Sequence, residues 1–181
     1  MRSATLFIAC LSILFSLTLC RQKENQHEIY MEADSLVALT MVLQSRIGSP
    51  EIQRMHEFQE EIDKDLSSLS AVPKKDTSLL KYQELYNRLG QCLQACNQYH
   101  EEAYLLESSL REIMVRIQSK EAELVNLHEL LHLENDNYAK LSRRIDSSMD
   151  LAILHAEVFY SLKPGIDKMR GQIDLVPDPT P

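Results

Sequence analysis

Apolar residues recur between Tyr82 and Leu162 at alternating spacings of three and four residues, without one break in the pattern. This heptad spacing is typical of a long helix that buries one continuous seam, because seven residues make nearly two helical turns. One half of the seam is entirely apolar or aromatic: Tyr82, Leu89, Cys96, Ala103, Leu110, Ile117, Leu124, Leu131, Tyr138, Ile145, Ala152 and Phe159. The pattern predicts an all-α fold built on a long coiled-coil-like helix.

The other half of the seam is mostly apolar but is interrupted by Lys120, Glu134, Ser148 and His155. Such residues either penalise wrong registers or face solvent where the helix is unpaired, and the sequence leaves both interpretations open. A buried His155 would add a response to pH, because an imidazole titrates near pH 6.5. The most apolar stretch is the predicted interaction seam: Leu106, Leu110, Ile113, Ile117, Leu124, Leu127 and Leu131.

The weakest part of the long helix is the polar stretch Glu134-Asn135-Asp136-Asn137. A turn there would give a compact four-helix bundle. Neither Gly nor Pro marks a turn, and the heptad phase continues across the stretch, so we favour one continuous helix. Such a helix would extend about 120 Å over residues 82 to 162. Its apolar stripe is wider than one partner helix needs, which indicates a second copy or another protein as cover.

Two shorter amphipathic patterns precede the long helix, over residues 27–47 and 50–72. Gly48 between them suits the left-handed turn that ends a helix, and Ser49-Pro50 is typical of a new helix start. We therefore expect an N-terminal helical hairpin packed on the long helix. Asp76 or Thr77 is the expected cap of that helix. Lys163-Pro164-Gly165 is expected to end it, with a short turn or helix and a disordered Pro-rich tail over residues 164–181.

The N-terminus has the layout of a secretory signal over residues 1–20, followed by a polar spacer over residues 21–26. An almost uninterrupted apolar run from Leu6 to Leu19 follows the basic Arg2. Leu17-Thr18-Leu19-Cys20 resembles a bacterial lipobox, which predicts lipidation of Cys20 and a membrane-anchored lipoprotein at the cell envelope. Plain secretion to the periplasm or medium and an uncleaved anchor are the alternatives.

The formal net charge is −8, which disfavours nucleic acid as a partner because phosphate binding needs clustered Lys and Arg. Outside the signal and Cys20, the cysteines are Cys92 and Cys96, both on the seam. We interpret them as small buried hydrophobic residues. In a symmetric parallel dimer each would meet its own copy, so an interchain disulfide is the alternative.

One motif carries possible chemistry: His128-Glu129-Leu130-Leu131-His132 has the H-E-x-x-H spacing. It resembles the zincin metalloprotease motif, in which two imidazoles bind zinc and the glutamate is the general base. Glu157 is the candidate third ligand, and it would be out of reach on an unbroken helix. The motif lies on the flank and outer face of the seam, so we interpret these residues as a solvated surface, without a metal or other cofactor.

The sequence therefore predicts an exported helical protein that acts by protein–protein interaction or as a scaffold or spacer, without catalysis. The partner is expected to bind through the coiled-coil seam, or the chain to associate with itself. A zinc-dependent hydrolase using the H-E-x-x-H motif and a bundle that binds a small ligand between its helices are the two alternatives.

Overall fold

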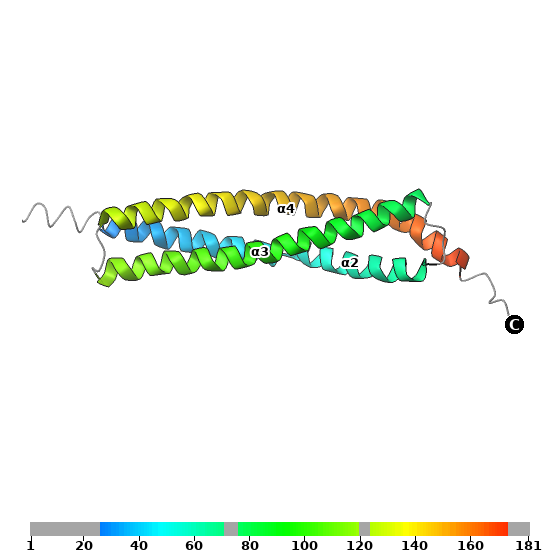
Figure 1. The fold of residues 1–181 in the computed structure, drawn as a ribbon, viewed down its shortest axis with the longest axis horizontal. Helices are drawn as coiled ribbons and strands as arrows, with labels where there is room; N and C mark the ends of the chain where they lie inside the picture. Colours follow the sequence, from blue (N-terminus) through cyan, green and yellow to red (C-terminus); the bar gives the residue numbers. More distant parts are fainter. Residues whose placement is uncertain (1–25, 71–75, 120–123, 174–181) are drawn as a thin grey trace, which may run out of the picture. The chain divides into compact units, whose positions relative to one another are not determined.

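The computed structural model describes residues 26–70, 76–119 and 124–173, and the predicted all-α architecture is confirmed within them. A first helix over residues 26–47 is followed by α2 (Pro50–Ser68), α3 (Thr77–Ser119) and α4 (Leu124–Ile173). Figure 1 shows this order along the chain. Asp76 caps α3 as expected, because its Oδ1 accepts hydrogen bonds from the backbone N–H groups of Ser78 and Leu79, at 2.8 and 3.2 Å.

The N-terminal segment is a bent helix, so the expected hairpin is wrong. Gly48 does not adopt a left-handed backbone, and its N–H still donates to the carbonyl of Gln44 as in a helix. Arg46 pairs with Asp146 and Asp65 pairs with Lys163, at sequence separations of 100 and 98. Because the sequence separation is nearly constant, the N-terminal segment runs parallel to α4 on both sides of the bend. In a hairpin its second half would run antiparallel to the first.

The single continuous helix expected over residues 82–162 is also wrong, because α3 ends at Ser119 and α4 begins at Leu124. The two helices run antiparallel. The Cys92–Ser148 contact joins residues that are 56 apart in sequence, and the Glu102–Arg144 pair joins residues that are 42 apart. The sequence separation therefore falls toward the connection between α3 and α4. Folding back lets the two halves of the seam cover one another, whereas a single rod would leave much of it in water. The stretch 134–137 lies inside α4 and forms no turn.

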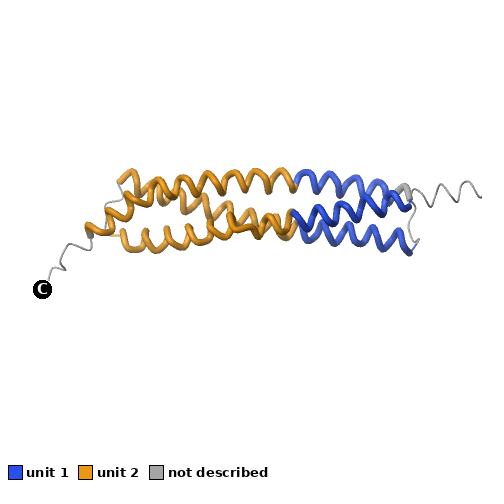
Figure 2. The backbone as a smooth tube through the Cα atoms, turned by 180° about the vertical axis from the view of Figure 1, so that it is seen from behind, with its two compact units in different colours: residues 1–42, 103–140 blue, residues 43–102, 141–181 orange. Residues whose placement is uncertain are grey.

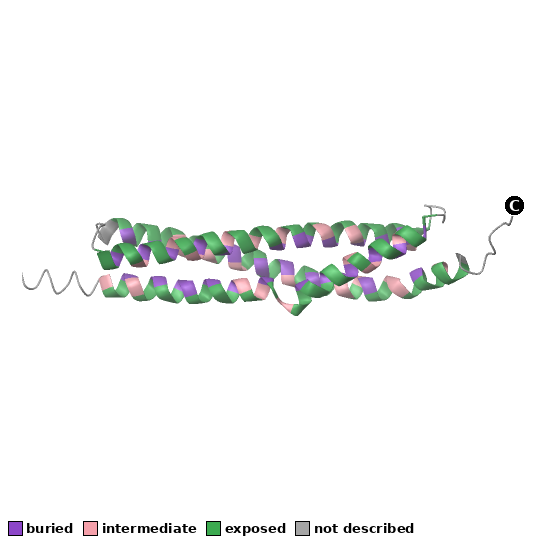
Figure 3. Cartoon of the chain, turned by 90° about the horizontal axis from the view of Figure 1, so that it is seen from below, coloured by how far each residue is buried: buried purple, intermediate pink, exposed green. Residues whose placement is uncertain are grey.

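The chain divides into two compact units (Figure 2). Among the described residues, unit 1 contains 26–42, 103–119 and 124–140, and unit 2 contains 43–70, 76–102 and 141–173. Buried residues recur along each helix between exposed ones, as Figure 3 shows in purple. The apolar periodicity therefore serves to bury one stripe of every helix inside the chain itself.

The core of unit 2 is aromatic where its three helices meet. Phe58 of α2 stacks on Phe159 of α4 at 4.3 Å between ring centroids, and Tyr82 of α3 lies 6.2 Å from the same ring. The Tyr82 hydroxyl donates to the buried carboxylate of Asp65, which also accepts from Lys163 and Arg170. Each helix thus contributes to a single apolar cluster with a buried ionic group beside it.

Helix α4 does not end at Lys163-Pro164-Gly165 but continues through Pro164 to Ile173. Proline removes one helical hydrogen bond and bends the helix, and the orange and red end of α4 leaves at an angle in Figure 1. The last turns are held by tertiary contacts, because Ile166 is fully buried and Arg170 pairs with Asp65. These contacts offset the cost of the proline.

Candidate functional site

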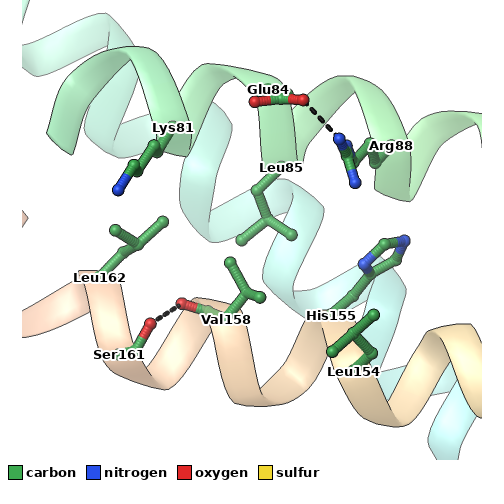
Figure 4. A pocket seen from close by; sticks show the side chains of 9 residues that line it. All are labelled: Lys81, Glu84, Leu85, Arg88, Leu154, His155, Val158, Ser161 and Leu162. Carbon is green, nitrogen blue, oxygen red and sulfur yellow. Dashed lines mark hydrogen bonds and ion pairs between the residues drawn. The ribbon is translucent and has the colours of Figure 1, made fainter. Parts of the chain in front are cut away.

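A groove runs between α3 and α4 in unit 2. It consists of two pockets of about 410 and 570 Å³, which meet at Arg88 and His155 because both residues line both pockets. The first pocket, drawn in Figure 4, is lined by Lys81, Glu84, Leu85, Arg88, Leu154, His155, Val158, Ser161 and Leu162. The second is lined by Arg88, Gln91, Cys92, Ala95, Tyr99, Arg144, Ser147, Ser148, Leu151 and His155. We call these two pockets together the α3–α4 groove.

The α4 wall of this groove is an apolar stripe formed by Leu151, Leu154, Val158 and Leu162. Their spacings of three and four residues place them on one side of the helix. The core stripe of α4 contains Ala152, His155 and Phe159 and is buried, so the groove stripe lies beside it. Leu151 and Leu154 are 43% and 48% exposed, which leaves about half of each apolar side chain in water.

The α3 wall has apolar residues at its base and charged or polar residues at its rim. Leu85 and Cys92 are buried at its base, whereas Lys81 and Arg88 stand at the rim. The Arg88 guanidinium pairs with Glu84 one turn earlier on α3, at 2.5 Å, and Figure 4 marks this contact. The groove therefore offers an apolar surface with Lys81, Glu84 and Arg88 along one edge, where cations outnumber carboxylates.

Farther along the groove, Arg144 of α4 lies over the ring of Tyr99, with its guanidinium carbon 4.6 Å from the ring centroid. Its guanidinium also pairs with Glu102 at 2.6 Å. The hydrogen bonds to Glu102 and Tyr99 raise the pKa of Arg144 further above its already high value. This cation is thus held in place, charged, at the second pocket.

His155 forms part of the groove base, with 5% of its surface exposed. Burial lowers its pKa below the ordinary value of 6.5, and repulsion from Arg88 lowers it further. The neutral imidazole is therefore the favoured form at neutral pH. The sequence left open whether His155 and Ser148 were buried or exposed, and both are buried in unit 2.

Cys92 and Cys96 are both free and buried on α3, as their position on the seam predicted. The Cys92 thiol lies 3.9 Å from the backbone carbonyl oxygen of Ser148 on α4. A hydrogen bond from Cys96 lowers the pKa of Cys92, and the same contact, with burial, raises the pKa of Cys96. Both thiols belong to the chain's own core, so a disulfide to a second copy would require α3 and α4 to separate.

The predicted interaction seam lies inside unit 1 and is covered by the chain's own helices. Buried there are Leu106, Leu110, Ile113, Ile117, Leu127 and Leu131, whereas the side chain of Leu124 is outside the described residues. A partner of the folded chain therefore needs another surface. The sequence showed an apolar stripe wider than one partner helix needs, and Leu151 and Val158 of that stripe line the α3–α4 groove.

The H-E-x-x-H residues are on α4 in unit 1, and His128, Glu129 and His132 are all exposed. The imidazole ring centroids of His128 and His132 are 6.2 Å apart, and the ring planes are inclined at 64°. Glu157 is exposed in unit 2. Within residues 26–70, 76–119 and 124–173, no group of three or more His, Cys, Asp or Glu residues is placed to hold a metal ion.

The predicted signal sequence and Cys20 lie outside the described residues. Among the helices that the structure describes, none combines the length and the apolar character needed to span a bilayer. Comparisons with protein-family models, curated proteins and solved structures gave no significant match to this chain.

Proposed function

We propose that this chain is an exported helical protein that acts by protein–protein interaction, as a scaffold or spacer at the cell envelope, without catalysis. We assign the α3–α4 groove as its binding surface. One observation carries this assignment: the groove's α4 wall is an apolar stripe in which two leucines, Leu151 and Leu154, are left 43% and 48% exposed. Contiguous apolar surface in a hollow with a polar rim is typical of binding sites.

Burying a leucine side chain completely contributes about 1.5–3 kcal/mol, so covering the exposed halves of Leu151 and Leu154 would contribute about 2 kcal/mol together. Val158 and Leu162 are partly exposed beside them and would add to this term. Such a contribution corresponds to more than tenfold in affinity.

The proposed location depends on the sequence of residues 1–20, whose apolar run and terminal Cys20 favour export and lipidation. Labelling producer cells with a radioactive fatty acid tests this part separately. We expect label on the parent chain and none on Cys20→Ala. Equal labelling of both chains would refute lipidation at this residue.

The binding surface is tested by affinity capture of the full chain from the cells that produce it. Leu154→Arg places a charge in the groove, whereas Ile153→Arg places one on the adjacent residue, which is 55% exposed and does not line either pocket. We expect a partner that is captured by the parent and by Ile153→Arg but lost with Leu154→Arg. The absence of any partner that depends on Leu154 would refute the assignment.

A further inference from the structure

From the shape and charge of the α3–α4 groove, we infer that its occupant is an amphipathic α-helix with an apolar face and acidic flanks, supplied by a different protein. This inference rests on the proposed function and specifies the chemistry of the partner.

The shape of the groove fits a helix. On α3 its lining runs from Lys81 to Tyr99, which is about 27 Å at 1.5 Å per residue. Side chains at spacings of three and four residues line both walls, so the apolar side chains of an incoming helix can pack between them. Unit 2 is built from three helical segments, and a fourth beside α3 and α4 would give the packing of a four-helix bundle.

The charge of the groove specifies acidic flanks. The lining contains Lys81, Arg88 and Arg144 but a single carboxylate, Glu84, in a chain with a net charge of −8. Lys81 forms no ion pair within the part of the chain that the structure describes. The pair of Arg88 with Glu84 is solvent-exposed, and such pairs are weak, so Arg88 can turn to a carboxylate on a partner, whereas Arg144 stays over Tyr99 and beside Glu102.

The same charges argue against a second copy of this chain as the occupant. In a symmetric dimer each surface meets itself, so groove-to-groove contact would bring the basic residues of one groove onto those of the other. Burying like charges together is unfavourable. An acidic helix from another protein meets one carboxylate in the lining, Glu84, against three basic residues.

The test uses the full chain and designed peptides of 18 residues with a leucine face, labelled with a fluorophore at the N-terminus. One peptide carries Glu on both flanks, one carries Lys, and a third has the Glu composition with a central proline that breaks the helix. Fluorescence anisotropy measures the dissociation constants, and sedimentation measures the mass of the chain alone. We expect the Glu helix to bind at least about tenfold more tightly than either control, and less tightly in high salt.

Variants of the chain locate the effect. Lys81→Glu with Arg88→Glu should reverse the preference in favour of the Lys helix. Arg54→Glu with Lys64→Glu changes the net charge equally at exposed α2 positions outside the groove, and should leave the preference unchanged. Leu154→Arg should abolish binding of the Glu helix.

Equal binding of the Glu and Lys helices, or binding that survives Leu154→Arg, would overturn the inference. If all peptides fail while cell capture still yields a partner that depends on Leu154, the acidic helix is refuted and the proposed function stands. A dimer that Leu154→Arg dissociates would identify a second copy as the occupant and also overturn it.

Discussion

The carboxylate of Asp65 offers the sharpest test of how unit 2 is held together. Its side chain is 2% exposed and accepts hydrogen bonds from the Tyr82 hydroxyl at 2.8 Å, Lys163 Nζ at 2.7 Å and Arg170 at 2.9 Å. These donors come from α3 and from α4 on either side of Pro164. We predict that Asp65→Ala strongly destabilises the fold.

The magnitude follows from what each donor loses. The Tyr82 hydroxyl is fully buried, and an unsatisfied buried donor costs about 1–3 kcal/mol. Lys163 keeps Glu61 and Asp167, at 2.8 and 2.9 Å, and Arg170 is 46% exposed, so solvent and these partners recover part of both ionic losses. Breaking a buried pair costs about 3–5 kcal/mol, and we expect the lower part of that range, about 3 kcal/mol.

Urea unfolding followed by circular dichroism at 222 nm measures this loss. With a slope of about 2 kcal/mol/M, a cost of 3 kcal/mol lowers the midpoint by about 1.5 M. Asp65→Asn keeps an acceptor for Tyr82 and should lose less.

Two further variants control the interpretation. Glu61→Gln removes an exposed partner of Lys163 and should cost less than about 1 kcal/mol. Tyr82→Phe combined with Asp65→Ala should cost less than the two single changes added together, because the unsatisfied hydroxyl is gone. A cost of Asp65→Ala within about 0.5 kcal/mol of zero, or equal to that of Glu61→Gln, would refute the reasoning.

Three further outcomes are expected. Because the pKa of His155 is lower in the folded chain, the unfolded chain takes up a proton first as the pH falls. The contribution of His155 to the free energy of unfolding is therefore full above about pH 6.5. Below that pH it decreases, by at most about 1.4 kcal/mol per pH unit. Urea unfolding at about pH 7.5, 6.5 and 5.5 should show this decrease reduced in His155→Gln, and identical profiles would count against a buried neutral imidazole. Gly165→Ala should raise stability by about 0.5–1 kcal/mol in thermal unfolding, because the residue is helical and a Cβ meets nothing within 4 Å, and a lower melting temperature would contradict this. Leu110→Ala should lower the free energy of unfolding by about 2–5 kcal/mol, because Leu110 is buried. Leu105→Ala, at an exposed α3 position, should lower it by less than about 0.5 kcal/mol. Equal losses would mean that the seam is not buried in the chain's own core.

Capping residues in the sequence predicted those helix starts that depend only on interactions within the first turn. Ser49-Pro50 starts α2 and Asp76 caps α3, since each acts on its own first turn. The sequence signals for helix ends failed at Gly48 and Pro164. A glycine permits a left-handed turn without requiring it, and a proline can be tolerated within a helix when contacts such as those of Asp65 with Lys163 and Arg170 hold the turns around it.

The sequence by itself determined that the chain is helical and which apolar stripe of the long heptad pattern faces the core, because the heptad period depends only on helix geometry. It also placed Cys92, Cys96 and the seam leucines in the core. Only the tertiary structure decided what covers that seam. A heptad pattern is the same for a helix that meets a second copy and for one that meets its own continuation, and the antiparallel return of α4 along α3 buries both halves within one chain. That return leaves the flank at Leu151 and Leu154 partly exposed, and this flank forms the α4 wall of the α3–α4 groove.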